Sequence, residues 1–126
     1  NEFRNISTVG FMKHNGGLEF RKISDDEYEF KTEIQDYHIN AGGVTHGGFI
    51  MSMLDSGMGT AAHQVIEGKA VTISLNTNFI GGSKAGDEII GFAKIKKKTR
   101  SLIFMYGHLK CQDKLLASAE GIWKII

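Results

Sequence analysis

The sequence contains no proline and only one cysteine, Cys111. Without proline, every sharp turn has to be made by glycine, asparagine, aspartate or serine. A single cysteine excludes an internal disulfide and is typical of a protein kept in a reducing compartment. No basic-then-apolar leader precedes the first expected strand, so we expect a cytoplasmic protein.

An excess of one charge is also lacking. Fifteen Lys and Arg residues face 14 Asp and Glu residues, and the formal net charge of +1 indicates neither a nucleic-acid nor a membrane-surface partner. The longest apolar run, residues 41–66, contains Asp55, His63 and several glycines, which argues against a membrane-spanning segment. The length of 126 residues and the ordinary composition predict a single globular domain over residues 1–126.

Alternation of apolar and polar residues predicts strands over much of the remaining chain. In residues 27–34, EYEFKTEI, the even-numbered positions carry Tyr, Phe, Thr and Ile while the odd-numbered positions are charged, as in a strand with one buried face. Residues 17–23 are predicted to form its hairpin partner. Four further strands are predicted at residues 70–80, 87–96, 101–111 and 115–126.

Residues 47–66 differ, because they do not alternate and are rich in Met, Ala and Leu, so we predict a helix of about five turns. Apolar residues cover most of its circumference, which is typical of a helix buried on nearly all sides. Gly57 and Gly59 each cost about 1 kcal/mol relative to Ala in a helix interior, so we expect another backbone to pack closely there. A single buried helix needs a sheet that curves around it. The element order therefore predicts an α+β fold in which an antiparallel sheet covers the helix.

Asp55 is the only acid in this predicted helix. A buried carboxylate without a cation nearby loses several kcal/mol of solvation, and no Lys or Arg lies within two turns. Such a residue is either satisfied by a hydrogen-bond network or belongs to a functional site, where it can act as a base. The neighbours of Asp55 favour the functional interpretation.

The start of the helix offers donors for a negatively charged oxygen. Gly47 and Gly48 let a ligand approach the backbone, and the first N–H groups of a helix have no internal partner. They suit the oxyanion that forms when a carbonyl is attacked, although two glycines also suit a simple tight loop. Asn40 can hold a carbonyl or a water, or can be an ordinary turn residue. His46 is expected to orient or cap the helix more than to transfer protons.

Spacing along the helix points to two copies of the chain. Asp55 lies eight residues after Gly47, which is about 12 Å along a helix. A base and an oxyanion donor both have to lie near one carbonyl. One helix cannot readily supply both, whereas two helices packed antiparallel about a two-fold axis can. We therefore expect a dimer whose active sites lie across the interface.

The segment NAGGVTHGGFIMSMLDSGMGTAAH, residues 40–63, resembles the signature of hotdog-fold acyl-CoA thioesterases of the PaaI-like (phenylacetyl-CoA thioesterase) group. The shared pattern is N-x-x-G-x-x-H-G-G, with Asp seven residues after the second glycine. The similarity continues through the strands and covers most of the chain from about Gly17. It implies a long central helix wrapped by a curved antiparallel sheet, in homodimers that often pair into dimers of dimers.

The resemblance also implies roles for individual residues. Asp55 would be the general base or nucleophile, and the Gly47 N–H would polarise the thioester carbonyl. Asn40 would place the carbonyl or the attacking water, and His46 would support that loop. Thr72 matches a position where relatives often have Ser or Thr near the water.

Substrate contacts follow from the same resemblance. Gly48 would help to bind the substrate, and Lys97, Lys98 and Arg100 match positions where relatives often meet the phosphates of coenzyme A. A solvated hairpin tip is the alternative for these three cations. The family frequently has proline after the asparagine, where this chain has Ala41, and in the loop before residue 84, where it has Gly81–Ser83. Neither change removes a chemical group.

The predicted activity is hydrolysis of an acyl-CoA to a carboxylic acid and free coenzyme A, with no cofactor beyond the coenzyme A of the substrate. The alternative is a non-catalytic hotdog module that binds acyl-CoA as a sensor. A hydroxyacyl dehydratase would need an acid–base pair of a His and an acid at different positions, and the sequence lacks that motif. His and Cys residues show no metal-ligand spacing, so no metal site is expected. The acyl group stays open, because six large side chains can line either its pocket or the core: Phe11, Phe49, Met51, Met53, Met58 and Phe79.

Overall fold

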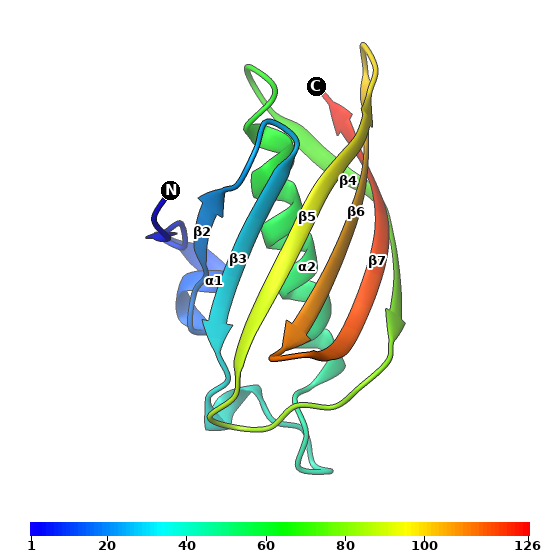
Figure 1. The fold of residues 1–126 in the computed structure, drawn as a ribbon. Coiled ribbons are helices and arrows are strands. Elements are labelled where there is room, and N and C mark those ends of the chain that lie inside the picture. Colours follow the sequence, from blue (N-terminus) through cyan, green and yellow to red (C-terminus); the bar gives the residue numbers. More distant parts are fainter.

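A computed structural model describes all residues, 1–126, as one curved sheet with a helix in its concave side (Figure 1). Its elements follow the chain in this order: β1 (Arg4–Asn5), α1 (Gly10–His14), β2 (Glu19–Lys22), β3 (Glu27–Glu33), a 3-10 turn (Asp36–His38), α2 (Gly47–His63), β4 (Ala70–Phe79), β5 (Glu88–Lys98), β6 (Leu102–Cys111) and β7 (Lys114–Ile125).

All seven strands join in one antiparallel sheet in the order β1-β2-β3-β5-β6-β7-β4. The sheet wraps around α2, which confirms the α+β fold, and each predicted strand is present within one to two residues of its expected ends. β1 and α1 were not predicted. Both are short, and residues 1–16 show no period that would indicate them. No helix is long and apolar enough to cross a membrane.

One face of α2 packs against the sheet. Its buried side chains join those of the strands in a single core, which includes Phe30, Leu54, Met58 and Trp123. The helix ends at His63, three residues before the predicted end. There the N–H groups of Gln64 and Val65 donate to the carbonyls of Ala61 and Ala62, which tightens the last turn.

Two helix glycines are explained by aromatic rings rather than by a second backbone, so that expectation was wrong. A Cβ at Gly57 would lie 2.5 Å from the ring of Phe30, and one at Gly91 on β5 would lie 2.2 Å from the same ring. Phe30 therefore fills the space that both glycines leave. A Cβ at Gly59 would lie 3.2 Å from Nε1 of Trp123.

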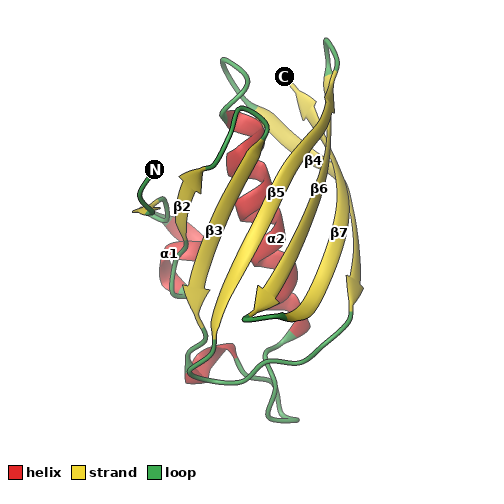
Figure 2. Ribbon diagram, in the orientation of Figure 1, coloured by secondary structure: helices red, strands yellow, loops and turns green.

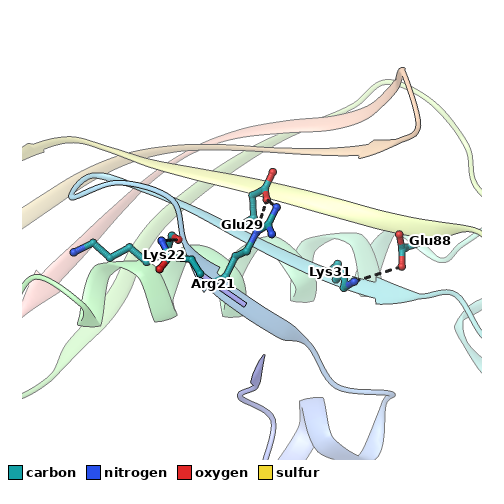
Figure 3. A network of polar contacts seen from close by, with 6 residues as sticks. Arg21, Lys22, Glu29, Lys31 and Glu88 are labelled. Carbon is teal, nitrogen blue, oxygen red and sulfur yellow. Dashed lines mark hydrogen bonds and ion pairs between the residues drawn. The ribbon is translucent and has the colours of Figure 1, made fainter. Parts of the chain in front are cut away.

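The two edges of the sheet differ (Figure 2). At one edge, β4 pairs only with β7, has a bulge between Thr72 and Ser74, and exposes Val71 and Ile73. At the other, short β1 and β2 carry charged side chains. Figure 3 shows the cross-strand ion pairs Arg21–Glu29 and Lys31–Glu88 near this edge. Such partly exposed pairs contribute little stability but oppose pairing with another chain.

Replacing Gly57 by Ala should destabilise the fold. Alanine favours helix, but its Cβ would displace the Phe30 ring, and overpacking of a core typically costs about 1–3 kcal/mol. Urea unfolding should show a lower midpoint for Gly57→Ala. Gly59→Ala is the matched control on the same helix, because its Cβ meets only the indole edge, and its midpoint should stay near that of the wild type. Equal effects of the two substitutions would contradict the packing described for Phe30.

Candidate active site on the open face of the central helix

Asp55 lies on the exposed side of α2, next to the edge strand β4. The expectation that it sits inside a helix buried on nearly all sides was therefore wrong. The apolar residues of α2 gather on the sheet side, while Met51, Asp55 and His63 fall on the exposed side at helical spacing. No cation pairs with the Asp55 carboxylate.

Thr72 is the partner of Asp55. Its hydroxyl donates a hydrogen bond of 2.6 Å to Oδ1 of Asp55. The edge strand β4 places Thr72 opposite Trp123 of β7, just before the bulge, so its side chain faces the helix. The structure thus brings together a carboxylate and a hydroxyl that are 17 residues apart in the sequence.

A cleft of about 420 Å³ opens beside this pair. Its walls are the exposed stripe of α2, the start of β4 and the segment that leads into α1, and Trp123 forms part of its floor. The lining residues are Ile6, Ser7, Thr8, Val9, Met12, Asp55, Ser56, Gly59, Thr60, His63, Ala70, Val71, Thr72 and Trp123. Of the six large side chains left open by the sequence, none lines this cleft. Phe49, Met53 and Met58 belong to the core, and Phe11, Met51 and Phe79 are exposed.

His46 is the N-cap of α2. Its Nδ1 accepts a 2.8 Å hydrogen bond from the Gly48 N–H, which satisfies one of the free donors of the first turn. The N–H of Gly47 has no partner within the chain. It therefore remains available at the positive end of the helix dipole. The Phe79 ring lies beside Gly47, 3.3 Å from the position of a Cβ.

Asn40 shapes the loop that leads into this helix. Its Oδ1 accepts hydrogen bonds from the N–H groups of Gly42 (2.9 Å) and Val44 (3.2 Å). Gly43 adopts a φ of +87° within that turn, a conformation that favours glycine. The oxygen of Asn40 is thus committed to the loop, and only its amide nitrogen is left to contact a ligand.

The helix tip and the acid open onto different clefts. His46 and Gly48 line a second cleft of about 440 Å³, which does not include Asp55. Gly47 and Asp55 are two turns apart on the same rigid helix, about 12 Å along its axis. One chain therefore does not bring the carboxylate and the free amide to a common point.

Lys97, Lys98 and Arg100 lie at the β5–β6 hairpin, far from the helix tip. The end of β7 connects this hairpin to the segment that follows α2: the Ile125 N–H donates to the Ser101 carbonyl, and the Ile126 N–H donates to the Lys69 carbonyl. The hairpin therefore lies at the opposite end of the helix from Gly47 (Figure 1). The side chains of Lys97, Lys98 and Arg100 are exposed and form no ion pair. No cluster of His, Cys, Asp and Glu side chains has the arrangement of a metal site.

A curved antiparallel sheet wrapped around one long helix defines the hotdog class of proteins. The family model named Thioesterase superfamily matches residues 42–118, more than half of the chain. The chain therefore belongs to the thioesterase superfamily and is a thioester hydrolase. Both the resemblance and the activity class expected from the sequence are confirmed.

Individual relatives agree with this assignment. The Pseudomonas aeruginosa protein PA0474 is 30% identical and covers 73% of this chain, which spans 70% of that protein. Mouse acyl-coenzyme A thioesterase 13 is 32% identical over 70% of this chain, which spans 65% of that protein. Among solved structures, Pseudomonas aeruginosa PA5202 superposes with a TM-score of 0.85 at 24% identity, covering 95% of this chain and 97% of that one. The E. coli PaaI protein, from a phenylacetic acid degradation operon, has a TM-score of 0.81 at 16% identity, covering 86% and 79%. Both solved structures have the same fold as this chain.

The structure adds residues that the sequence did not indicate. The floor residue Trp123 and the stretch from Ile6 to Val9 line the Asp55 cleft, yet neither belongs to a motif. The sequence pattern around Trp123 indicates only an ordinary core residue of the last strand. The one available signal was that it is the only tryptophan in the chain.

Replacing His46 should separate capping from proton transfer. His46→Ala removes the acceptor for the Gly48 N–H and should lower the free energy of unfolding by about 1 kcal/mol. His46→Asn supplies another good N-cap and should restore most of the lost free energy of unfolding. Urea unfolding of the three proteins measures this, alongside thioester hydrolysis. If turnover is lost in His46→Asn while stability is retained, His46 takes part in the chemistry directly.

Proposed function

We propose that the chain hydrolyses acyl-CoA thioesters at two equivalent sites, each shared between the protomers of a homodimer. The observation that carries this proposal is the arrangement on α2. Asp55, hydrogen-bonded to Thr72, and the free N–H of Gly47 lie on one helix but too far apart to act on the same carbonyl. Two copies are needed to complete each site.

Met51 supports a specific geometry for that dimer. It lies midway between Gly47 and Asp55 on the same stripe of α2, and it is 37% exposed. When two antiparallel helices cross with their two-fold axis at Met51, Asp55 of one protomer lies beside Gly47 of the other. The free edge of β4, with exposed Val71 and Ile73, supplies further apolar surface for the contact. Pairing of such dimers into dimers of dimers stays a prediction.

Asp55 is the residue that initiates the reaction. As a general base, it takes a proton from a water held with the help of Thr72, and the resulting hydroxide adds to the thioester carbon. The tetrahedral intermediate then collapses with cleavage of its C–S bond, and the departing coenzyme A thiolate takes the proton that Asp55 received from the water. As a nucleophile, the Asp55 carboxylate instead attacks the carbonyl and expels the coenzyme A thiolate, and water then hydrolyses the resulting anhydride to the acid product and free Asp55. Both routes use the same residues.

The helix tip of the other protomer stabilises the charge on the carbonyl oxygen. The Gly47 N–H donates a hydrogen bond to this oxyanion, which then lies at the positive end of the α2 dipole. Gly48 leaves the backbone open to the substrate, and the amide nitrogen of Asn40 is free to hold the carbonyl or the water. His46 stabilises this loop by capping the helix through the hydrogen bond from the Gly48 N–H.

Lys97, Lys98 and Arg100 are proposed to bind the phosphates of coenzyme A.

Substitution of Asp55 tests the mechanism. Asp55→Asn and Asp55→Ala should lower kcat by about 100-fold or more, because each removes the base or nucleophile. The side chain is exposed, so circular dichroism should show an intact fold. Thiol release is measured with aryl, short-chain, medium-chain and long-chain acyl-CoAs. Glu67→Gln, an acid-to-amide change at an exposed position just beyond α2, is the matched control and should keep wild-type turnover. Wild-type turnover in the Asp55 variants would remove Asp55 from the mechanism.

The oxyanion donor can be deleted by Gly47→Pro. Proline is favoured at the first position of a helix and lacks an N–H, and the extended backbone of His46 (φ −61°, ψ 133°) accepts a following proline. Gly47→Ala adds a similar contact with Phe79 but keeps the N–H, so it is the matched control. We expect a loss of about 100- to 1000-fold in kcat for the proline variant relative to the alanine variant.

Mixed dimers test whether the sites are shared. Gly47→Pro and Asp55→Ala chains are each inactive alone, but a heterodimer of the two contains one site with both groups intact. Co-expressed chains should recover about a quarter of wild-type activity, because half of the dimers are mixed and each has one complete site. No recovery would place both groups within one chain. Tight acyl-CoA binding without thiol release by the wild type would instead favour a sensor.

A further inference from the structure

The indole N–H of Trp123 is an unused donor at the floor of the Asp55 cleft. Trp123 is 1% exposed and lines this cleft, and its Nε1 forms no hydrogen bond within the chain. An indole N–H can only donate, and buried tryptophans usually find an acceptor for it. Thr77 Oγ1 is the only buried side-chain polar atom without a hydrogen-bond partner, so Nε1 of Trp123 reaches the cleft, where a water or a bound molecule can accept its hydrogen bond.

Gly59 keeps this donor accessible. Gly59 of α2 lines the cleft, and a Cβ there would lie 3.2 Å from Nε1 of Trp123. Glycine is costly in a helix interior. No backbone within the chain packs against Gly59. The absence of a side chain there leaves the Trp123 N–H open to the cleft.

Two polar side chains of α2 that line this cleft, His63 and Thr60, are already engaged. Nδ1 of His63 donates to the carbonyl of Gly59 (2.7 Å), and Nε2 of His63 accepts from the N–H of Ala70 (3.2 Å). The hydroxyl of Thr60 donates to the carbonyl of Ser56 (2.7 Å). None of these hydrogen bonds involves Trp123, so its N–H is free to donate to a molecule bound in the cleft.

We propose that Trp123 determines acyl-group specificity by donating a hydrogen bond to an oxygen carried on the acyl chain. This inference rests on the proposed function, since Asp55 fixes where the thioester carbonyl lies. Gly59 follows Asp55 by one helical turn, about 6 Å along the axis. The matching substrate is therefore an acyl-CoA with a ketone or hydroxyl oxygen about five bonds from the thioester carbon. A purely aliphatic chain leaves the indole N–H unsatisfied.

Two substrates that differ in a single oxygen test this specificity. Hexanoyl-CoA is compared with its analogue that carries a ketone on the penultimate carbon. The wild type should prefer the ketone by about 3- to 10-fold in kcat/KM, the effect expected of one neutral hydrogen bond. Trp123→Phe removes the N–H and keeps an aromatic ring, and Gly59→Ala keeps the indole but covers its N–H. In both variants the ratio of the two kcat/KM values should fall to about one.

A binding measurement separates this inference from the proposed catalysis. Trp123 is the only tryptophan, so intrinsic tryptophan fluorescence reports on this site alone. Thioether analogues of the two acyl-CoAs, which cannot be hydrolysed, are titrated into the wild type and Gly59→Ala. The ketone analogue should bind about 3- to 10-fold more tightly to the wild type and shift its emission, and Gly59→Ala should lose both effects.

The outcomes are distinct. If no acyl-CoA releases thiol but the ketone analogue still binds more tightly in a Gly59-dependent manner, the proposed hydrolysis fails and the role of Trp123 stands. If hydrolysis occurs and both variants keep the wild-type ratio, Trp123 does not select the acyl group. Equal binding of the two analogues without an emission shift overturns the inference as well. Thermal melts of Trp123→Phe show whether this variant still folds. If it does not fold, the inference is tested by the kcat/KM ratio and the binding measurements on Gly59→Ala.

Discussion

The close packing of Phe30 against α2 is the contact on which the rest of the structure depends. Its ring occupies the space left by Gly57 on the helix and Gly91 on β5, so the sheet approaches the helix more closely than side chains at both positions would permit. Close-packed interiors tolerate little change in volume at such a point. One face of α2 is thereby committed to the sheet, and the opposite face is left for polar residues and glycine.

The candidate site residues take their positions from this rigid helix. His46 caps its first turn, Gly47 presents a free amide at its tip, and Asp55 lies two turns further along the open face. The hydrogen bond from Thr72 then ties the edge strand β4 to that face. Groups held on a packed helix keep a constant separation, so the fold fixes the distance between Gly47 and Asp55 that the proposed second protomer would bridge.

Sequence reasoning succeeded where the pattern was periodic. The alternation in residues 27–34 predicted β3, and the run from Gly47 predicted α2, because burial of one face imposes a period of 2 or 3.6. It failed for Asp55. Counting apolar residues around the helix suggested burial on nearly all sides, but small and sulfur-containing residues such as Met51 are tolerated on the exposed side.

The partners of the site were beyond local reasoning. Thr72 and Trp123 contact the Asp55 region only after β4 and β7 have paired, and no period within either strand encodes that contact. Thr72 was reached through a family resemblance, and Trp123 was not reached at all. The sequence left both a turn role and a ligand-binding role open for Asn40, because the two have the same spacing, and only the structure shows that its oxygen serves the loop.

The unpaired edge of β4 has a consequence for how the protein behaves at different abundances. Its free backbone groups and its exposed Val71 and Ile73 make it a surface for pairing with another chain. In the proposed dimer, dilution below the dissociation constant would remove complete sites while each chain keeps its fold. Activity per molecule would then rise with protein concentration, so total activity would grow more steeply than the amount of protein.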